Sequence, residues 1–140
     1  MQQSQLFMIL FIIVIISIFF FIYYKTKETS SDFIKSSIYF GRTYRNETEL
    51  SFENWNSYVD EVVTIFFPYG LTTTQSDGQM FDGTKIIKNK NFELLIVHKN
   101  DAKSKENIEK IIEIFRKKHN NELQVMKIQE NISVDFYNRK

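Results

Sequence analysis

The chain has 140 residues, with 18 Lys and Arg against 17 Asp and Glu, a formal net charge of +1 and no cysteine. The lack of cysteine excludes disulfides, thiolate zinc sites and cysteine nucleophiles. A nearly neutral chain without a basic cluster among stacking aromatics lacks the features of a nucleic-acid-binding protein, so no nucleic acid partner is expected. Every charged residue follows Tyr24, and the polar remainder is long enough for one domain but not two.

Residues 6–24 are apolar or aromatic except for Ser17. At about 1.5 Å per residue, a helix of this length roughly matches a hydrocarbon core about 30 Å thick. Tyr23 and Tyr24, followed by Lys25 and Lys27, are typical of the membrane interface. A cleaved signal peptide would need a basic start and a small-residue cleavage site, which are missing. We therefore expect a single-pass transmembrane anchor over residues 1–24, with the lipid bilayer as its partner through residues 6–24.

The basic residues around this segment predict its orientation. Lys25, Lys27 and Lys35 follow it, whereas no Lys or Arg precedes it. The positive-inside rule therefore favours a domain on the cytoplasmic side. Two sequons, at Asn46 and Asn131, would indicate the opposite side if they were glycosylated, but such triplets arise by chance in an Asn-rich chain.

Residues 25–36 are polar and rich in Ser and Thr, which predicts a linker, and the soluble domain is expected over residues 37–140. Residues 37–42 are strand formers that end near Gly41. Apolar residues then recur at spacings of three and four from Phe52 to Phe66. With Ser51 as N-cap and Pro68 beyond the end, this pattern predicts an amphipathic helix.

Residues 71–81 and 85–98 flank Asp82-Gly83, a dipeptide typical of a type I′ turn, and predict a hairpin with a bulge or bend at Asp77-Gly78. The continuous apolar run at residues 94–97 is expected in the middle of the sheet. A second amphipathic helix contains Ile108 and Phe115 and is expected to be capped by Ser104. Residues 123–128 and 132–136 alternate and predict a last strand with an extension.

The order of these elements predicts an α+β fold. Strand, helix, strand, strand, helix, strand is the ferredoxin-like βαββαβ arrangement, in which two helices lie on one face of an antiparallel sheet. Here that domain would follow one N-terminal transmembrane helix.

Several short stretches, in order and at compatible spacings, resemble the domain-of-unknown-function family 3574, whose members are small, mostly bacterial and often carry a signal peptide or lipid anchor. The matching stretches are residues 38–42, Trp55, 61–64, 67–72, Gly78-Gln79, Asp82-Gly83 and 94–98. The chain departs from the family pattern at Met80, where an aromatic residue is usual, and at Ile65-Phe66, where a Pro-Arg-like pair is usual. The resemblance implies fold and boundaries but no activity, because the family has none established.

Five residues are candidates for a site. His98, at the end of the expected central strand, could act as a general base or simply bond the backbone or water. Arg42 could pair with Glu61, while Tyr39 and Gln79 could line the same pocket. His119 lies at a helix end without metal-ligand spacing to His98, so neither a metal nor a cofactor is expected.

Two functions remain open from the sequence. The favoured one is a membrane-anchored binding or structural module, such as an accessory subunit of a membrane or virion assembly, which binds protein partners or forms a homo-oligomer. The alternative is a small enzyme or ligand-binding protein with a pocket between sheet and helices. Because fold alone specifies no reaction, catalysis is the less favoured of the two.

Overall fold

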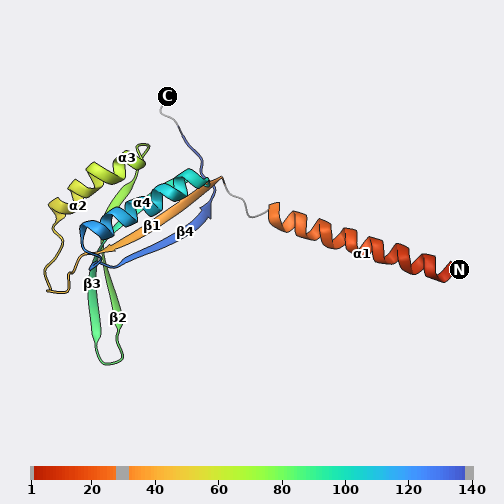
Figure 1. The fold of residues 1–140 in the computed structure, drawn as a ribbon, viewed down its shortest axis with the longest axis horizontal. Coiled ribbons are helices and arrows are strands. Elements are labelled where there is room, and N and C mark those ends of the chain that lie inside the picture. The colour runs from red at the N-terminus through yellow and green to blue at the C-terminus, as the bar shows by residue number, and fades with distance from the viewer. Residues whose placement is uncertain (1, 28–31, 138–140) are drawn as a thin grey trace. The chain divides into compact units, whose positions relative to one another are not determined.

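The computed structural model describes residues 2–27 and 32–137. They belong to two compact units, one N-terminal to Asp32 and one that starts there. The first unit is the helix α1 (Gln2–Lys27), shown in red and orange in Figure 1. Its described side chains are mostly large and apolar and are exposed. Among the described residues, no helix has the length and sustained apolar character needed to cross a membrane, so the predicted span over residues 6–24 is not supported.

The second unit is an α+β fold built on four antiparallel strands. Its elements in chain order are β1 (Phe33–Gly41), α2 (Phe52–Tyr58), η1 (Val59–Val63), α3 (Thr64–Phe66), β2 (Thr72–Phe81), β3 (Ile86–Lys99), α4 (Ala102–Lys118) and β4 (Val125–Ile132). The strand order is β2-β3-β1-β4, so β1 and β3 are central, as Figure 1 shows. The prediction that the run at residues 94–97 lies in the middle of the sheet is confirmed.

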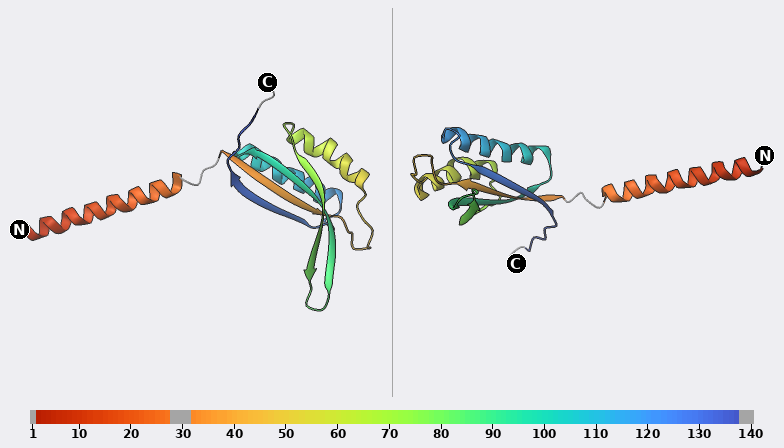
Figure 2. Two further views of the ribbon diagram at one scale, coloured as in Figure 1. Left: turned by 180° about the vertical axis from the view of Figure 1, so that it is seen from behind. Right: turned by 90° about the horizontal axis from the view of Figure 1, so that it is seen from below.

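The core lies between the helices and one face of the sheet, and the two views in Figure 2 show the helices on that face. Alternate residues of β1 and β3, such as Phe40 and Phe92, point into the core and are fully buried. Trp55 and Tyr58 of α2 and Phe115 of α4 pack against them. This aromatic cluster joins both helices to the two central strands.

The predicted helix over residues 52–66 is present, but it is not a regular α-helix. Ser51 caps it as expected, accepting a bond from the backbone N–H of Asn54 at 3.2 Å. Residues 59–63 then form a π-helical turn, in which the Thr64 hydroxyl donates to the Val59 carbonyl at 3.0 Å. Such turns insert one extra residue per turn, and hydrophobic spacing alone does not reveal them.

The cap of α4 differs from the predicted one. Asp101 is the N-cap, because its carboxylate accepts a hydrogen bond from the Ser104 backbone N–H at 2.7 Å. This bond from Ser104 lowers the pKa of Asp101. At its C-terminal end, Asn120 and Asn121 both adopt the left-handed region after Lys118.

Four strand predictions need correction. The first strand begins at Phe33, so residues 33–36 of the expected linker belong to β1. The β2–β3 pairing runs without interruption through Asp77 and Gly78, so the predicted bulge is absent there. The hairpin loop has four residues instead of a two-residue type I′ turn, since Asp82 accepts bonds from Thr84 and Lys85. The last strand continues through residues 130 and 131, and residues 133–137 are not a strand.

Candidate functional site

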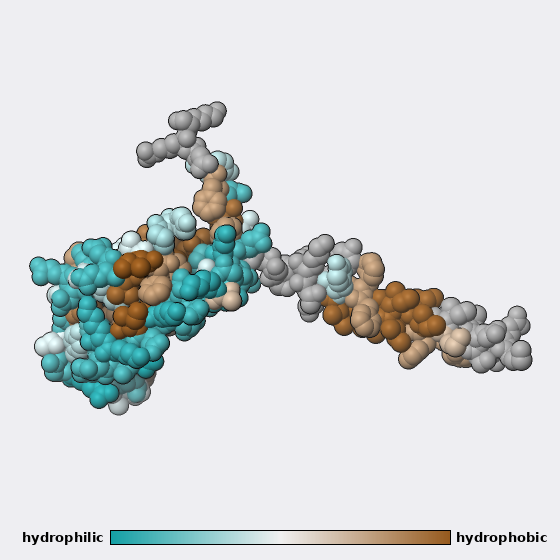
Figure 3. Space-filling model, turned by 45° about the horizontal axis from the view of Figure 1, so that its top comes forward, coloured by the Kyte–Doolittle hydropathy of each residue, from teal (hydrophilic) through white to brown (hydrophobic). Residues whose placement is uncertain are grey.

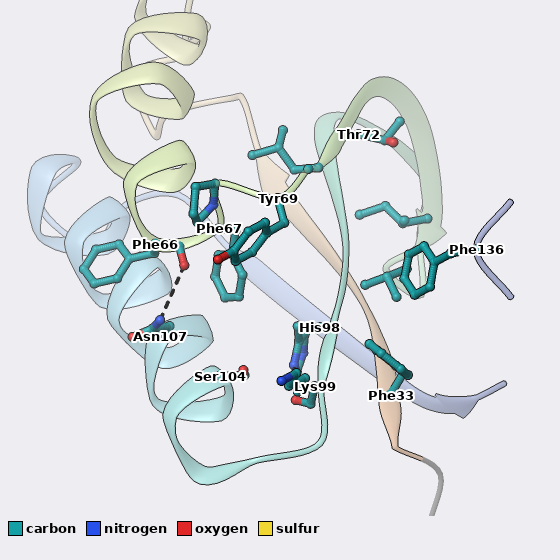
Figure 4. A pocket seen from close by; sticks show the side chains of 15 residues that line it. Phe33, Phe66, Phe67, Tyr69, Thr72, His98, Lys99, Ser104, Asn107 and Phe136 are labelled. Carbon is teal, nitrogen blue, oxygen red and sulfur yellow. Dashed lines mark hydrogen bonds between the residues drawn. The ribbon is translucent and has the colours of Figure 1, made fainter. Parts of the chain in front are cut away.

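A cavity of about 880 Å³ opens at one end of the sheet. There β2 begins at Thr72, opposite Leu95, while β3 continues to Lys99 without β2 beside it. Figure 4 shows that its walls come from the segment after α3, the end of β3, the start of α4 and the C-terminal segment around Phe136. Most of the lining is apolar or aromatic, including Phe66, Phe67, Tyr69, Leu71 and Val97. Cavities of this size with few polar groups are typical of ligand sites.

The cavity exists because the chain turns away between α3 and β2. Pro68 prevents the helix from continuing, and Gly70 adopts a φ of 136°, a conformation that side chains rarely allow. The chain therefore enters the sheet only at Thr72, which pairs with Leu95. The last four residues of β3 extend past this point, and three of them, Val97, His98 and Lys99, line the cavity.

His98 is the predicted site residue that lines the cavity, and it is only 5% exposed. Its Nδ1 is 2.8 Å from the Lys99 carbonyl oxygen, which can only accept, so Nδ1 carries the proton. Its Nε2 is therefore free to accept a bond from the Ser36 hydroxyl, also at 2.8 Å. The Gln129 amide donates in turn to Ser36 Oγ at 3.0 Å. Both ring nitrogens of His98 thus have partners within the protein.

This network leaves His98 without a nitrogen that could take a proton from a substrate. Ser36, its partner, is fully buried and is not among the residues that line the cavity. The arrangement has the spacing of a serine–histidine pair but not the access that a nucleophile needs. His98 instead presents its ring as part of the cavity wall, 5.9 Å from the ring of Phe67.

Other polar groups at the cavity include side chains of α4 and β3. The Asn107 amide donates to the Phe66 carbonyl at 3.5 Å, which ties α4 to the end of α3. Its buried Oδ1 has no hydrogen-bond partner among the described residues. Lys99 is the one charged residue of the fifteen that line the cavity. The site therefore combines an apolar body with a single positive charge.

The other four predicted site residues do not join His98. Arg42 lies over the ring of Phe92, 4.4 Å from its centroid, and it pairs with Glu49 at 3.4 Å instead of with Glu61. Glu61 is exposed and accepts a bond from Ser57. The physical reason is a bridge between Thr43 and Glu49, which folds the segment after β1 back on itself.

Tyr39 and Gln79 also lie away from the cavity. Tyr39 is on the sheet face opposite the core, where burial and a hydrogen bond to Glu93 raise its pKa. Gln79 is exposed on β2, opposite Lys88 in the hairpin. The expected pocket lined by all five residues is therefore not the cavity that the structure contains.

Sequence reasoning missed Ser36, Gln129 and Asn107 as partners at this site. The available signal was the family resemblance, because all six residues of the stretch 67–72 line the cavity. Leu95, Val97 and His98, from another matching stretch, line it as well. Among the described residues, no three His or acidic side chains are grouped as a metal site would require.

The second histidine, His119, is a structural residue at the end of α4. Its Nδ1 is 2.6 Å from the Tyr44 hydroxyl, and its ring lies 4.5 Å from that of Phe115. Burial lowers the pKa of His119, and the neighbouring Lys118 lowers it further. Burial raises the pKa of Tyr44, so its hydroxyl stays protonated and donates to the neutral imidazole.

This pair predicts a pH dependence of stability. In the unfolded chain His119 regains an ordinary pKa of about 6.5. Because the folded pKa is lower, the unfolded state binds the proton more readily, and the free energy of unfolding should fall as the pH drops below about 6.5. Urea unfolding between pH 7.5 and 5.5, followed by circular dichroism, measures this slope. His119→Gln keeps an acceptor for Tyr44 and should flatten the slope; an unchanged slope would contradict the assignment.

Comparison with known proteins gives a family and a similar fold. No curated protein matches the chain. Among solved structures, a phage SAM lyase in complex with S-methyl-5′-thioadenosine is similar, with a TM-score of 0.51 and 11% identity over 78% of this chain and 90% of that chain. At this identity the similarity shows the fold alone. Residues 35–136, well over half of the sequence, match the family described as protein of unknown function (DUF3574). The chain therefore belongs to the DUF3574 family.

Proposed function

We propose that the folded unit is a binding module and that its ligand occupies the cavity beside the end of β3. The observation that carries this proposal is the cavity itself, about 880 Å³ in volume, with aromatic walls and one charged lining residue, Lys99. Apolar walls provide affinity by burying ligand surface, while a few polar groups orient the ligand. The ferredoxin-like arrangement belongs to the same proposal, supported by the strand order β2-β3-β1-β4 with helices on one face.

Binding is favoured over catalysis by the state of His98. General acid–base chemistry needs a group within hydrogen-bond reach of the substrate proton. The two ring nitrogens of His98 are bonded to Ser36 and to the Lys99 backbone, so neither can meet a substrate unless the network breaks. Of the remaining polar lining residues, Asn107 is tied by its amide to the Phe66 carbonyl, and Ser104 is hydrogen-bonded to the Asp101 carboxylate that caps α4.

The experiment is a fragment screen by ligand-observed NMR on the full-length chain in lipid nanodiscs. Val97 lines the cavity and is 39% exposed, so Val97→Glu places a charge in the apolar wall with little cost to the fold. Fragments that bind the wild type should lose about tenfold or more in affinity, equivalent to roughly 1.4 kcal/mol.

The matched control is Met126→Glu. Met126 is on the same sheet face, is 54% exposed and is not among the cavity residues. The Met126→Glu substitution should therefore leave fragment binding unchanged. A screen without binders, or binders that respond equally to both substitutions, would rule out the cavity as the site.

A second candidate function is favoured by the structural comparison. The similar phage SAM lyase binds S-methyl-5′-thioadenosine. In this chain, Phe67 and Tyr69 could stack on a purine ring, since both line the cavity and Tyr69 is fully exposed. Titration with S-methyl-5′-thioadenosine tests this candidate directly. A nucleoside ligand would be supported by saturable binding that is weakened by Tyr69→Ala but not by Tyr137→Ala. Absence of binding at millimolar concentration would exclude S-methyl-5′-thioadenosine as the ligand.

The N-terminal helix is proposed to tether this module to a lipid bilayer through residues 6–24, with the domain on the cytoplasmic side. Its described side chains from Phe11 to Tyr23 are exposed and almost all apolar, as the brown surface in Figure 3 shows, and such a surface needs a cover. Lys25 and Lys27 follow it. A protein partner or a second copy of the helix would cover the same surface.

Extraction with alkaline carbonate separates these possibilities. A lipid-embedded chain should stay in the membrane pellet, and a variant with Ile15→Lys and Phe19→Lys should be released, because charges in a hydrocarbon core cost several kcal/mol. Release of the wild-type chain would rule out the lipid tether.

A further inference from the structure

The open edge of β3 lies at the centre of the cavity. β2 pairs with β3 only as far as the pair Thr72 and Leu95, while β1 pairs with β3 as far as the pair Phe33 and Lys99. Residues 96–99 therefore have a neighbouring strand on one side only, among the residues that the structure describes. We propose that this edge binds an extended peptide segment of a partner protein as an added strand. The proposal rests on the cavity being the binding site and names its ligand class.

Two hydrogen bonds fix which backbone groups face the open side. The Arg42 N–H donates to the Lys90 carbonyl at 3.0 Å, and the Asn100 N–H donates to the Asp32 carbonyl at 2.9 Å. The backbone groups of the even-numbered residues Lys90 and Asn100 thus point toward β1 and the residues that flank it. Because backbone groups alternate between the two sides of a central strand, odd-numbered residues of β3 point the other way. Val97 and Lys99 therefore direct their N–H groups at the cavity.

The carbonyl groups of these two residues differ. The Lys99 carbonyl is held by the His98 ring, whereas the Val97 carbonyl has no such partner among the described residues. Val97 thus presents both a donor and an acceptor, spaced as a β-strand presents them, and Lys99 adds a second donor. A backbone segment satisfies this set better than an irregular small molecule does, since added strands derive affinity from main-chain bonds.

The side chains around the edge suit alternating residues. Figure 4 shows Phe67 and His98 on the helix side of the edge and Phe136 on the other side. Val97 lies on the side opposite His98, because successive residues of a strand point to opposite faces. A strand in the position opposite Val97 would place successive side chains against these two apolar surfaces in turn. Both surfaces belong to one cavity, so the cavity wraps around the edge.

Charge selects the residue opposite Lys99. Lys99 is the one charged residue among the cavity lining, and directly opposite residues on neighbouring strands project to the same face. An acidic side chain at that position would complete a cross-strand pair. The inferred partner is therefore an extended segment with alternating apolar side chains and an acidic residue at one end.

The test uses the full-length chain in nanodiscs and the blocked peptide acetyl-Thr-Glu-Leu-Val-Leu-Thr-amide. In an antiparallel added strand, its Glu lies opposite Lys99 and its Val lies opposite Val97. We expect saturable binding and at least tenfold slower hydrogen exchange at the Val97 and Lys99 amides. A peptide methylated on its central Val nitrogen keeps every side chain but loses a main-chain donor, and it should bind at least tenfold more weakly.

Charge reversal provides the specificity control. Lys99→Glu should weaken binding of the peptide that contains Glu. The same variant should bind a peptide in which Lys replaces that Glu. Val97→Pro removes an N–H that the sheet does not use, so it should abolish peptide binding; if that variant does not fold, the methylated peptide makes the same measurement on the wild type.

Three results would overturn the inference. They are equal affinity for the methylated peptide, no peptide binding at millimolar concentration, and Val97 and Lys99 amides as protected in the free chain as that of His98. If fragments still bind the cavity in a manner sensitive to Val97→Glu, the proposed function stands while the strand addition fails. Absence of both fragment binding and peptide binding would exclude the cavity as a binding site.

Discussion

Replacing Trp55 with alanine is expected to lower the free energy of unfolding of the folded unit by about 3–5 kcal/mol. Trp55 is 1% exposed and stacks on Phe92, with ring centroids 4.7 Å apart and planes within 5°. It also lies 5.2 Å from the ring of Phe40. Truncation would leave a large void between α2 and both central strands, which the rigid sheet cannot close.

The measurement is chemical denaturation followed by circular dichroism, because Trp55 is the single tryptophan and its fluorescence is lost with it. Phe52, on the same helix and 51% exposed, is the matched control, and its replacement by alanine should cost about 1 kcal/mol or less. Equal losses from the two substitutions would show that the aromatic cluster does not hold α2 against the sheet.

The parts of this fold that were predictable from sequence are those with local, periodic signals. Spacings of three and four placed Trp55 on the buried face of its helix, and the apolar run at residues 94–97 identified a central strand. The family resemblance is confirmed by the match of the family model over residues 35–136. In each case the signal is carried by neighbouring residues, so no knowledge of distant contacts was needed.

The errors arise where distant residues decide the outcome. Ser36 reads as part of a polar linker, yet it is fully buried in β1 because His98, sixty-two positions away, accepts its hydroxyl hydrogen bond. Arg42 pairs with Glu49 because a turn brings that carboxylate back to the strand end. Neither contact has a periodic signature.

The cavity was not predictable for a related reason. It depends on how far β2 extends along β3, which Pro68 and Gly70 limit by turning the chain before Thr72. The sequence shows both turn residues but not the register of the pairing that follows them. A difference of two residues in that register would pair Val97 and remove the open edge.

The second large effect is expected from the network in which the buried Ser36 and His98 bond each other and the exposed Gln129 donates to Ser36. His98→Ala should lower the free energy of unfolding by about 2–4 kcal/mol, since it removes a buried ring and leaves the Ser36 hydroxyl without its acceptor. Ser36→Ala should cost about 1–3 kcal/mol, because it leaves the buried His98 Nε2 without its hydrogen-bond donor. The double variant should cost less than the sum of the two, by about 1–2 kcal/mol.

This double-mutant cycle also tests the role assigned to His98 at the cavity. If its ring serves as a wall held in place by Ser36, then Ser36→Ala should weaken fragment binding without contact between Ser36 and the ligand, because the ring is no longer fixed at one nitrogen. Strictly additive losses of stability, together with unchanged fragment affinity in Ser36→Ala, would mean that the pair is incidental to both the fold and the site. Coupled losses would instead link the packing of β1, β3 and β4 directly to the shape of the binding cavity.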